Sequence, residues 1–131
     1  MTSFELLNSI WELFSNDDEM LSLLNIENDN DLNRRIRTEN AMYEEFDVDD
    51  TPFVAIYIYE SSKTYNYLVN RGFLCIEVYA DSFTDASPVI KRVVSLMHDV
   101  YDYRIAFEGQ FVSELSSVYK YRVAFAPLIS S

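Results

Sequence analysis

Residues 53–60 read FVAIYIYE and residues 72–80 read GFLCIEVYA. Both runs are rich in β-branched and aromatic residues, which favour strands, and Pro52 stands just before the first run, where a strand tolerates proline. Apolar residues occupy both faces of the first expected strand, so helices of the chain or a neighbouring subunit should cover both sides. With residues 61–71 as a polar connection, the two runs predict a β-hairpin.

One amphipathic helix and two more strands are expected after this hairpin. Ser87 and Pro88 suit an N-cap and a first helical position, and the apolar residues that follow recur at helical spacing. Strands are expected at 103–108 and 119–125. Along the last strand a dry face should alternate with a wetter face that carries Lys120, Arg122 and Ala124.

The N-terminal part predicts a pair of helices. Thr2 and Glu5 have the spacing of a capping box, and the apolar residues that follow recur at helical spacing. A second start signal at 16–19 precedes a short helix that ends near residue 24. Residues 25–51 are rich in Asn, Asp and Glu, and we expect a mostly irregular excursion there, with a short helical turn near Tyr43.

These elements predict an α+β fold. A four-stranded, mainly antiparallel sheet should pack with an N-terminal helical hairpin and one long amphipathic helix. The length of 131 residues suits a single domain over 1–131, which is long enough to bury a core.

The net charge of −12 is concentrated in the first half of the chain. Residues 1–60 contain 15 acidic and 3 basic residues, whereas residues 61–131 contain 7 of each. Because DNA binding requires Lys and Arg to neutralise phosphates, direct DNA binding is not expected to be the main task. An acidic surface suits basic partners, or a channel along which DNA passes without specific binding.

The chain shows no pattern for membrane insertion or secretion. No apolar run approaches the roughly 20 residues that cross a bilayer, and no basic residue precedes the first apolar stretch. With Cys75 as the one cysteine, no disulfide can form within the chain. We therefore expect a protein that stays in the cytoplasm, without a membrane partner.

Residues suited to catalysis or cofactor binding are few. His98 is the one histidine and lacks identifiable triad partners, and Cys75 lies in an expected strand as a small hydrophobe. Two glycines cannot build the usual phosphate-cradling loops. We expect no enzymatic activity and no cofactor.

Two acidic stretches could hold a cation. Glu27, Asp29 and Asp31 alternate as in a calcium loop, but Leu32 and Thr38 occupy the positions of its glycine and its bidentate glutamate. The other stretch consists of Asp47, Asp49 and Asp50. We favour a solvated acidic loop over either metal site.

From about residue 53 to residue 126 the chain resembles the tail-completion, or tail terminator, proteins of long-tailed bacteriophages. The resemblance covers a little over half of the chain and includes no catalytic motif. An ordered pattern carries it: the Tyr-rich strand, the run 72–80, a helix with Ala86, Ile90, Val94 and Met97, then Phe107-Glu108-Gly109-Gln110 and the run 119–125. The acidic 25–51 segment is longer than the family pattern leads one to expect.

The resemblance implies a structural virion protein. Such a protein forms a hexameric ring on the tail tube, ends the polymerisation of the tube and offers a surface to the connector or neck protein of the head. The expected partners are further copies of the chain, the tail tube protein and the head connector. The expected location is the head-proximal end of the tail, reached from the host cytoplasm during assembly.

Two groups of residues are candidates for these roles. Subunit or tube contacts are expected at the hairpin end and in the loop 109–118, through Lys63, Tyr65, Tyr67, Arg71, Phe111, Val112 and Leu115. An acidic lumen or loop is expected at Glu44, Glu45, Asp47, Asp49 and Asp50. The alternative for each of them is a solvated turn.

Two other functions remain open. A neck protein that joins the head to the tail would also form rings, but it would attach to DNA-filled heads that lack tails and not to isolated tubes. An acidic cytoplasmic inhibitor or DNA mimic would explain the charge directly, and it would be a monomer or dimer that binds a basic enzyme tightly.

Overall fold

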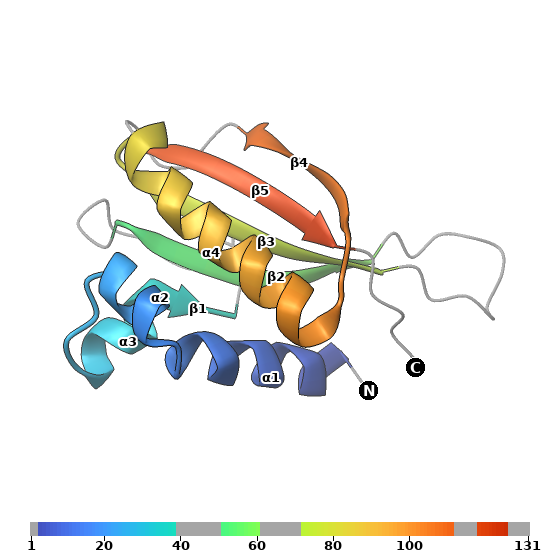
Figure 1. Cartoon of the computed structure of the whole chain (residues 1–131), viewed down its shortest axis with the longest axis horizontal. Helices are drawn as coiled ribbons and strands as arrows, with labels where there is room; N and C mark the ends of the chain where they lie inside the picture. The colour runs from blue at the N-terminus through green and yellow to red at the C-terminus, as the bar shows by residue number, and fades with distance from the viewer. Residues whose placement is uncertain (1–2, 39–50, 61–71, 112–117, 126–131) are drawn as a thin grey trace, which may run out of the picture.

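The computed structural model describes residues 3–38, 51–60, 72–111 and 118–125, which form an α+β structure (Figure 1). The helices are α1 (Ser3–Ser15), α2 (Asp18–Leu23), α3 (Asp29–Arg35) and α4 (Phe83–Tyr101). The strands are β1 (Ile36–Arg37), β2 (Phe53–Glu60), β3 (Gly72–Ala80), β4 (Ile105–Phe111) and β5 (Tyr119–Phe125).

In the described part of the chain the strands form one mixed sheet in the order β1-β2-β3-β5-β4. β2, β3, β5 and β4 pair antiparallel with their neighbours, and β1 pairs parallel with β2. The expectation of an α+β fold with a mainly antiparallel sheet is therefore confirmed. The sheet has one strand more than expected, because β1 lies in a segment that we expected to be irregular.

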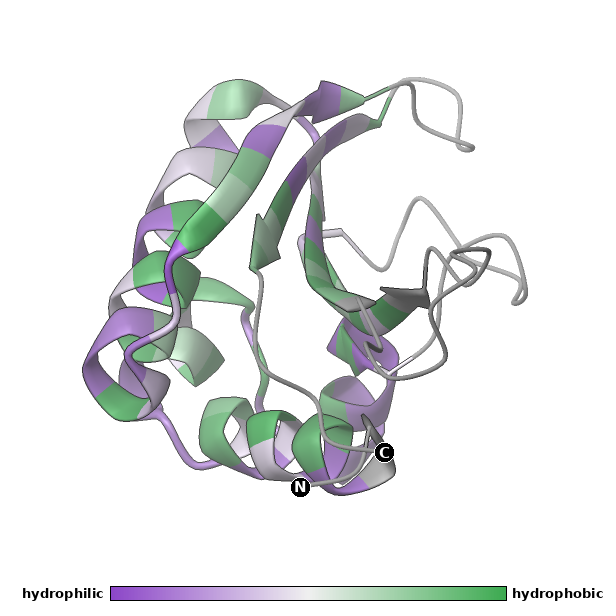
Figure 2. Ribbon diagram, turned by 90° about the vertical axis from the view of Figure 1, so that its right-hand side faces the viewer, coloured by the Kyte–Doolittle hydropathy of each residue, from purple (hydrophilic) through white to green (hydrophobic). Residues whose placement is uncertain are grey.

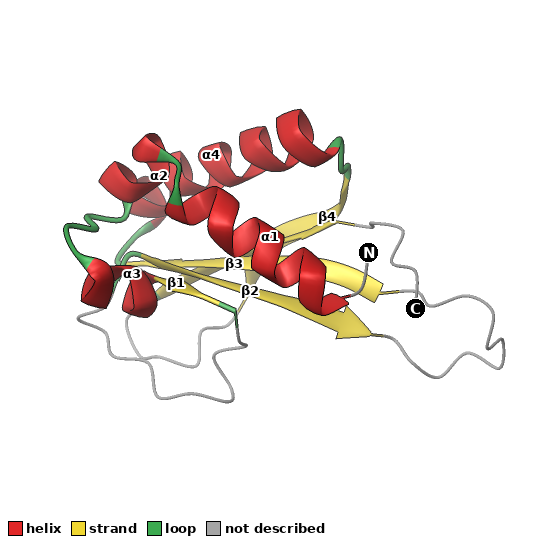
Figure 3. Cartoon of the chain, turned by 90° about the horizontal axis from the view of Figure 1, so that it is seen from below, coloured by secondary structure: helices red, strands yellow, loops and turns green. Residues whose placement is uncertain are grey.

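The helices lie on one side of the sheet (Figure 3). α4 packs on β3 and β5, and α1 packs against β1 and β2. The main core fills the space between these layers, because residues on alternate positions of the strands face the helices. Figure 2 shows the resulting alternation of hydrophobic and hydrophilic residues along α4 and the strands.

β2 is covered on both faces, as expected from its sequence. Val54 and Ile56 belong to the core under the helices, and Phe53, Ala55 and Tyr57 are buried on the opposite face. Because these five residues are buried within a single chain, their coverage does not need a neighbouring subunit.

The expectation of an irregular excursion at 25–51 is wrong where the structure describes that segment. Asn28 caps α3 by accepting a hydrogen bond from the backbone N–H of Asp31, and Arg34 and Arg35 lie in the last turn. Acids near the start and bases near the end of a helix complement its macrodipole. The polar composition that suggested a loop is thus the capping pattern of a short helix.

The side chains of α1 and α3 hold β1 in place. The indole N–H of Trp11 donates to the carbonyl of Ile36 at 3.1 Å. The Arg35 guanidinium donates to the carbonyls of Leu24 and Thr51, at 3.2 Å each. The bond from Trp11 satisfies a carbonyl of β1 that no further strand pairs, and the bonds from Arg35 tie the start of β1 to the segments around Leu24 and Thr51.

The expected start of the long helix at Ser87 and Pro88 is also wrong. α4 begins at Phe83 with Ser82 as its N-cap, whose hydroxyl accepts from the N–H of Asp85 at 3.3 Å. Pro88 lies inside the helix. A cap supplied by Ser82 starts the helix one turn earlier than the proline alone suggests.

The strand expected at 103–108 lies instead at Ile105–Phe111 and contains a bulge. Ile105 pairs with Phe125 and Phe107 pairs with Ala124, so Ala106 is the extra residue. Beyond the bulge, the side chains of β4 point to the face opposite to the one that an uninterrupted alternation from Ile105 would give them. Phe107, Gly109 and Phe111 consequently share the sheet face that lies away from the helices.

No helix in the described part of the chain is long and apolar enough to span a membrane.

An ion pair joins α2 to α4 and should control part of the stability. Asp17 is the N-cap of α2 and also accepts two hydrogen bonds from Arg92, at 2.9 and 2.5 Å. These bonds, those from Arg92 foremost, hold the pKa of Asp17 below its ordinary value of 3.8. A group with a lowered folded pKa stabilises the protein above its unfolded pKa and loses that effect as the pH falls through the folded pKa.

We therefore expect Asp17→Asn to lower the free energy of unfolding at pH 7 by about 2 kcal/mol, through loss of the charged pair and weakening of the cap. The difference from the parent protein should shrink as the pH falls below about 4. Urea unfolding at several pH values measures the stability difference and its dependence on pH. Asp18→Asn, one residue further along and exposed, is the control and should change stability by less than about 0.5 kcal/mol. Equal losses of unfolding free energy for the two variants would contradict the role of Asp17 as the partner of Arg92 and the cap of α2.

Candidate assembly surface

A buried carboxylate lies at the centre of the sheet, on the face away from the helices. Glu77 of β3 is fully buried, and it pairs across the strands with Ala55 of β2 and Arg122 of β5. The two small apolar clusters of this face lie on either side of it along the strands. A buried charge is costly unless it is paired and hydrogen-bonded, so its partners matter for the fold.

Two cations from β5 neutralise this carboxylate. Arg122 Nε and Nη2 lie 2.9 and 2.8 Å from Glu77 Oε2, and Lys120 Nζ lies 3.2 Å from the same oxygen. Lys120 is only 3% exposed. The expectation of a wetter face on β5 is therefore wrong for Lys120 and Ala124, both of which are buried. A lysine on a strand is usually solvated. Here Lys120 is buried because its ammonium group binds Glu77 of the neighbouring strand.

Tyrosines complete the set of hydrogen bonds around Glu77. The hydroxyl of Tyr79 donates to Glu77 Oε1 at 3.2 Å. The pKa of Tyr57 is raised well above its ordinary value, by burial first and then by the charge of Glu77 and a hydrogen bond to it. The Tyr57 phenol therefore stays protonated and donates to the carboxylate, beside the bond from Tyr79.

Cys75 lies in the same layer as a buried thiol. Burial raises its pKa, so the reactive thiolate is disfavoured. This agrees with the expectation of a small hydrophobe.

The charged cluster positions an exposed aromatic group at the edge of the sheet. The Arg122 guanidinium that binds Glu77 also lies 4.2 Å from the centroid of the Phe111 ring. Beside it, the rings of Phe73 and Phe107 pack edge to face, with their centroids 5.5 Å apart. Phe107 and Phe111 remain 41% and 37% exposed. We call this group, Phe73, Phe107, Gly109, Phe111 and Arg122, the β4 surface.

Gly109 lies between the two exposed phenylalanines of the β4 surface. Its φ is not positive, and a Cβ built on it would meet no atom within 4 Å. Neither backbone conformation nor packing inside the chain therefore requires glycine there. A glycine in a strand often marks a place where another backbone or a ligand approaches closely.

The two edges of the described sheet differ in protection. At one edge β1 is two residues long and its Ile36 carbonyl is bonded to Trp11. At the other edge β4 is seven residues long, contains neither proline nor lysine, and has mostly exposed side chains. Short strands, proline, lysine and β-bulges are the usual protection of an edge against pairing with another chain. β4 lacks the first three, and its bulge lies near its start, so Phe107–Phe111 pair regularly with β5 beyond it.

Of the residues expected to make subunit or tube contacts, only Phe111 is described. It lies at the end of β4, not in a loop, and it is exposed beside Arg122. Lys63, Tyr65, Tyr67, Arg71, Val112 and Leu115 lie outside the described residues, as do Glu44, Glu45, Asp47, Asp49 and Asp50. The structure adds Phe73, Phe107 and Arg122 to Phe111. The signal in the sequence was a glutamate in the strand 72–80 together with two cations in the strand 119–125, of which Arg122 lies directly opposite Glu77.

The other candidates for chemistry are accounted for within the described ranges. His98 is exposed in the last turn of α4, with its Nδ1 4.0 Å from Asp102 Oδ1. Asp29 and Asp31 belong to helix α3, and Asp31 binds Arg34 at 2.9 Å, so the calcium-loop pattern is a helix start. Across residues 3–38, 51–60, 72–111 and 118–125, no three His, Cys, Asp or Glu side chains are placed to hold a metal ion.

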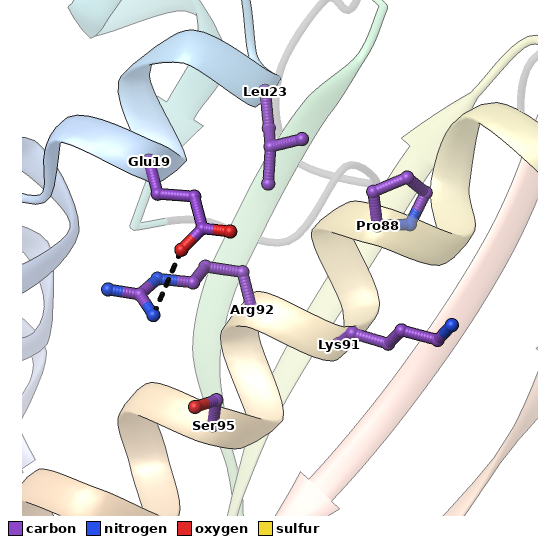
Figure 4. Close-up of a pocket in the computed structure, with 6 residues that line it drawn as sticks. All are labelled: Glu19, Leu23, Pro88, Lys91, Arg92 and Ser95. Carbon is purple, nitrogen blue, oxygen red and sulfur yellow. Dashed lines mark ion pairs between the residues drawn. The ribbon is translucent and has the colours of Figure 1, made fainter.

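A shallow hollow of about 280 Å³ lies between α2 and α4 (Figure 4). Glu19 and Arg92 point toward each other across it and form an ion pair at 3.1 Å. Arg92 also binds Asp17, so this hollow contains the link between the two helices. It gives no geometry for a reaction.

No family model matches the chain, and no curated protein matches it significantly.

Removing Glu77 alone should destabilise the protein far more than replacing Glu77, Lys120 and Arg122 together. Glu77→Leu leaves Lys120 and Arg122 without their buried partner, so we expect the free energy of unfolding to fall by about 3–5 kcal/mol. Replacing all three by apolar residues, as Glu77→Leu with Lys120→Met and Arg122→Leu, should recover most of this loss. Urea unfolding of the single and triple variants measures both effects. A single variant that stays within about 1 kcal/mol of the parent would contradict the role of Glu77.

Proposed function

We propose that this chain is a structural assembly protein, the tail terminator of a long-tailed bacteriophage. In this role six copies form a ring on the tip of the tail tube, stop its polymerisation and present a surface to the head connector. The resemblance of residues 53–126 motivates the proposal, and the observation that carries it furthest is the β4 surface. It offers exposed aromatic side chains of the kind that anchor protein interfaces.

The distribution of charge supports a head-to-tail arrangement of copies. Exposed carboxylates lie on or beside the N-terminal helices, at Glu12, Asp18, Glu19, Glu27 and Asp29. β4, at the other end of the sheet, instead exposes Phe107 and Phe111 beside a single carboxylate, Glu108. A ring is built from heterologous contacts between two different surfaces of each subunit. Opposite ends that differ in charge and polarity suit such a contact better than two identical acidic faces, which repel each other.

The acidic surface also suits the passage of DNA. A net charge of −12 repels phosphates, so a ring of such chains would not hold the genome as it moves through the tail.

The test is the polymerisation of the tail tube protein of the same phage with and without this chain, followed by electron microscopy. We expect tubes that stop growing and carry a ring at one end. Unchanged tube lengths and bare ends would overturn the proposal. Attachment to tailless, DNA-filled heads without any effect on tubes would instead identify a neck protein.

Substitution of the β4 surface tests where the contact lies. The double variant Phe107→Ser, Phe111→Ser should fold but cap tubes at least about tenfold less efficiently, because it removes two exposed aromatic anchors. Phe83→Ser is the matched control, since Phe83 is 57% exposed at the start of α4 and lies outside the β4 surface. Equal capping by the two variants would remove the β4 surface from the contact.

A further inference from the structure

The outer edge of β4 can accept an extended partner. The described sheet ends at this strand, so alternate backbone N–H and C=O groups of Ile105–Phe111 point outward. These groups are spaced for pairing with another strand, and the exposed phenylalanines of the β4 surface would flank such a strand. An exposed edge of this length without protective residues tends to pair with another chain.

We propose that the free protein forms a two-fold dimer in which β4 pairs antiparallel with β4 of a second copy, with Gly109 opposite Gly109. Each sheet would then continue into the other across the pair. The strand is self-complementary in this register, and this property identifies a second copy as the occupant.

The register follows from the residues that it brings together. With Gly109 on the two-fold axis, Phe107 lies opposite Phe111 of the second copy, and Glu108 lies opposite Gln110. Aromatic pairs placed directly across two strands stabilise a sheet. The absence of a side chain at Gly109 leaves the centre open, so the flanking rings can cover the paired glycines.

The neighbouring registers are less favourable. An axis at Glu108 places the two Glu108 side chains directly opposite each other, and like charges in that position destabilise a strand pair. It also places Phe107 opposite Gly109, so the aromatic pair is lost. An axis at Phe107 pairs the two Phe107 rings with each other. It places Glu108 opposite the bulged Ala106, however, and leaves Phe111 without an aromatic partner within β4.

This dimer is independent of the proposed ring. A two-fold contact joins identical surfaces, whereas a cyclic ring joins different ones. The pairing therefore describes the free protein, in which it covers the β4 surface before that surface is used on the tube.

A charge pair at position 110 tests the register. Gln110→Glu places a glutamate opposite Glu108 twice per dimer, so the dimer should dissociate about tenfold more readily. Gln110→Lys places a lysine there and should strengthen the dimer by a similar factor. Light scattering behind size exclusion, at a series of concentrations, measures the mass of each form. Because Gln110 is exposed, both variants should fold, which circular dichroism verifies.

A cysteine placed on the axis gives a second readout. Directly opposite residues in an antiparallel pair have Cα atoms about 4.5–5.5 Å apart, within the range of a disulfide. Gly109→Cys should therefore form a disulfide between two copies on mild oxidation, while Ala106→Cys should not, because six residues of offset separate its two copies by about 20 Å. Cys75 is buried and leaves the background low.

A strict monomer at every concentration would overturn the proposal. So would equal dissociation of the two Gln110 variants, or equal cross-linking of the two cysteine variants. A hexamer that is insensitive to all of them would overturn the two-fold pairing and leave the proposed ring standing.

Discussion

The need to neutralise one buried carboxylate constrains the centre of this structure. Glu77 lies on the central strand of the sheet, fully buried, and its charge is met by Arg122 and Lys120 of β5. If β5 slipped by one residue, both cations would turn toward the helices and Glu77 would lose them. The ion cluster thus fixes the register of β3 and β5 more strictly than apolar packing, which tolerates substitution, could do alone.

The same cluster determines what the outer part of the sheet presents. Arg122 reaches from Glu77 to the ring of Phe111, so the orientation of an exposed aromatic side chain depends on a buried charge. The bulge at Ala106 then brings Phe107 and Phe111 onto one face, with Gly109 between them. A surface built on strands in this way is held more rigidly than one built on loops, which suits a role in assembly.

The sequence predicted the elements whose pattern is strong and local. The bounds of β2, β3 and β5 agree with expectation, and α2 begins within the start signal at 16–19, because β-branched runs and acidic residues at a helix start have direct local causes. α3 and β1 were missed because a seven-residue helix with one apolar residue and a two-residue strand give too weak a periodicity. Buried Lys120 could not be foreseen from β5 alone, since its burial depends on Glu77, 43 positions earlier in the chain. The place of Phe111 was predicted in part: it is exposed, but on a strand and beside a cation that only the fold brings to it.

The central claim is that this protein acts by assembling through the open edge of its sheet. Amide hydrogen exchange of the dilute monomer and of the protein on tail tubes tests it most directly, because exchange reports whether individual backbone N–H groups are bonded. The account predicts that the amides of β4 gain protection on assembly, while those of β3 and β5, already paired on both sides, change little. Exchange from β4 that is equally fast in both states would contradict it.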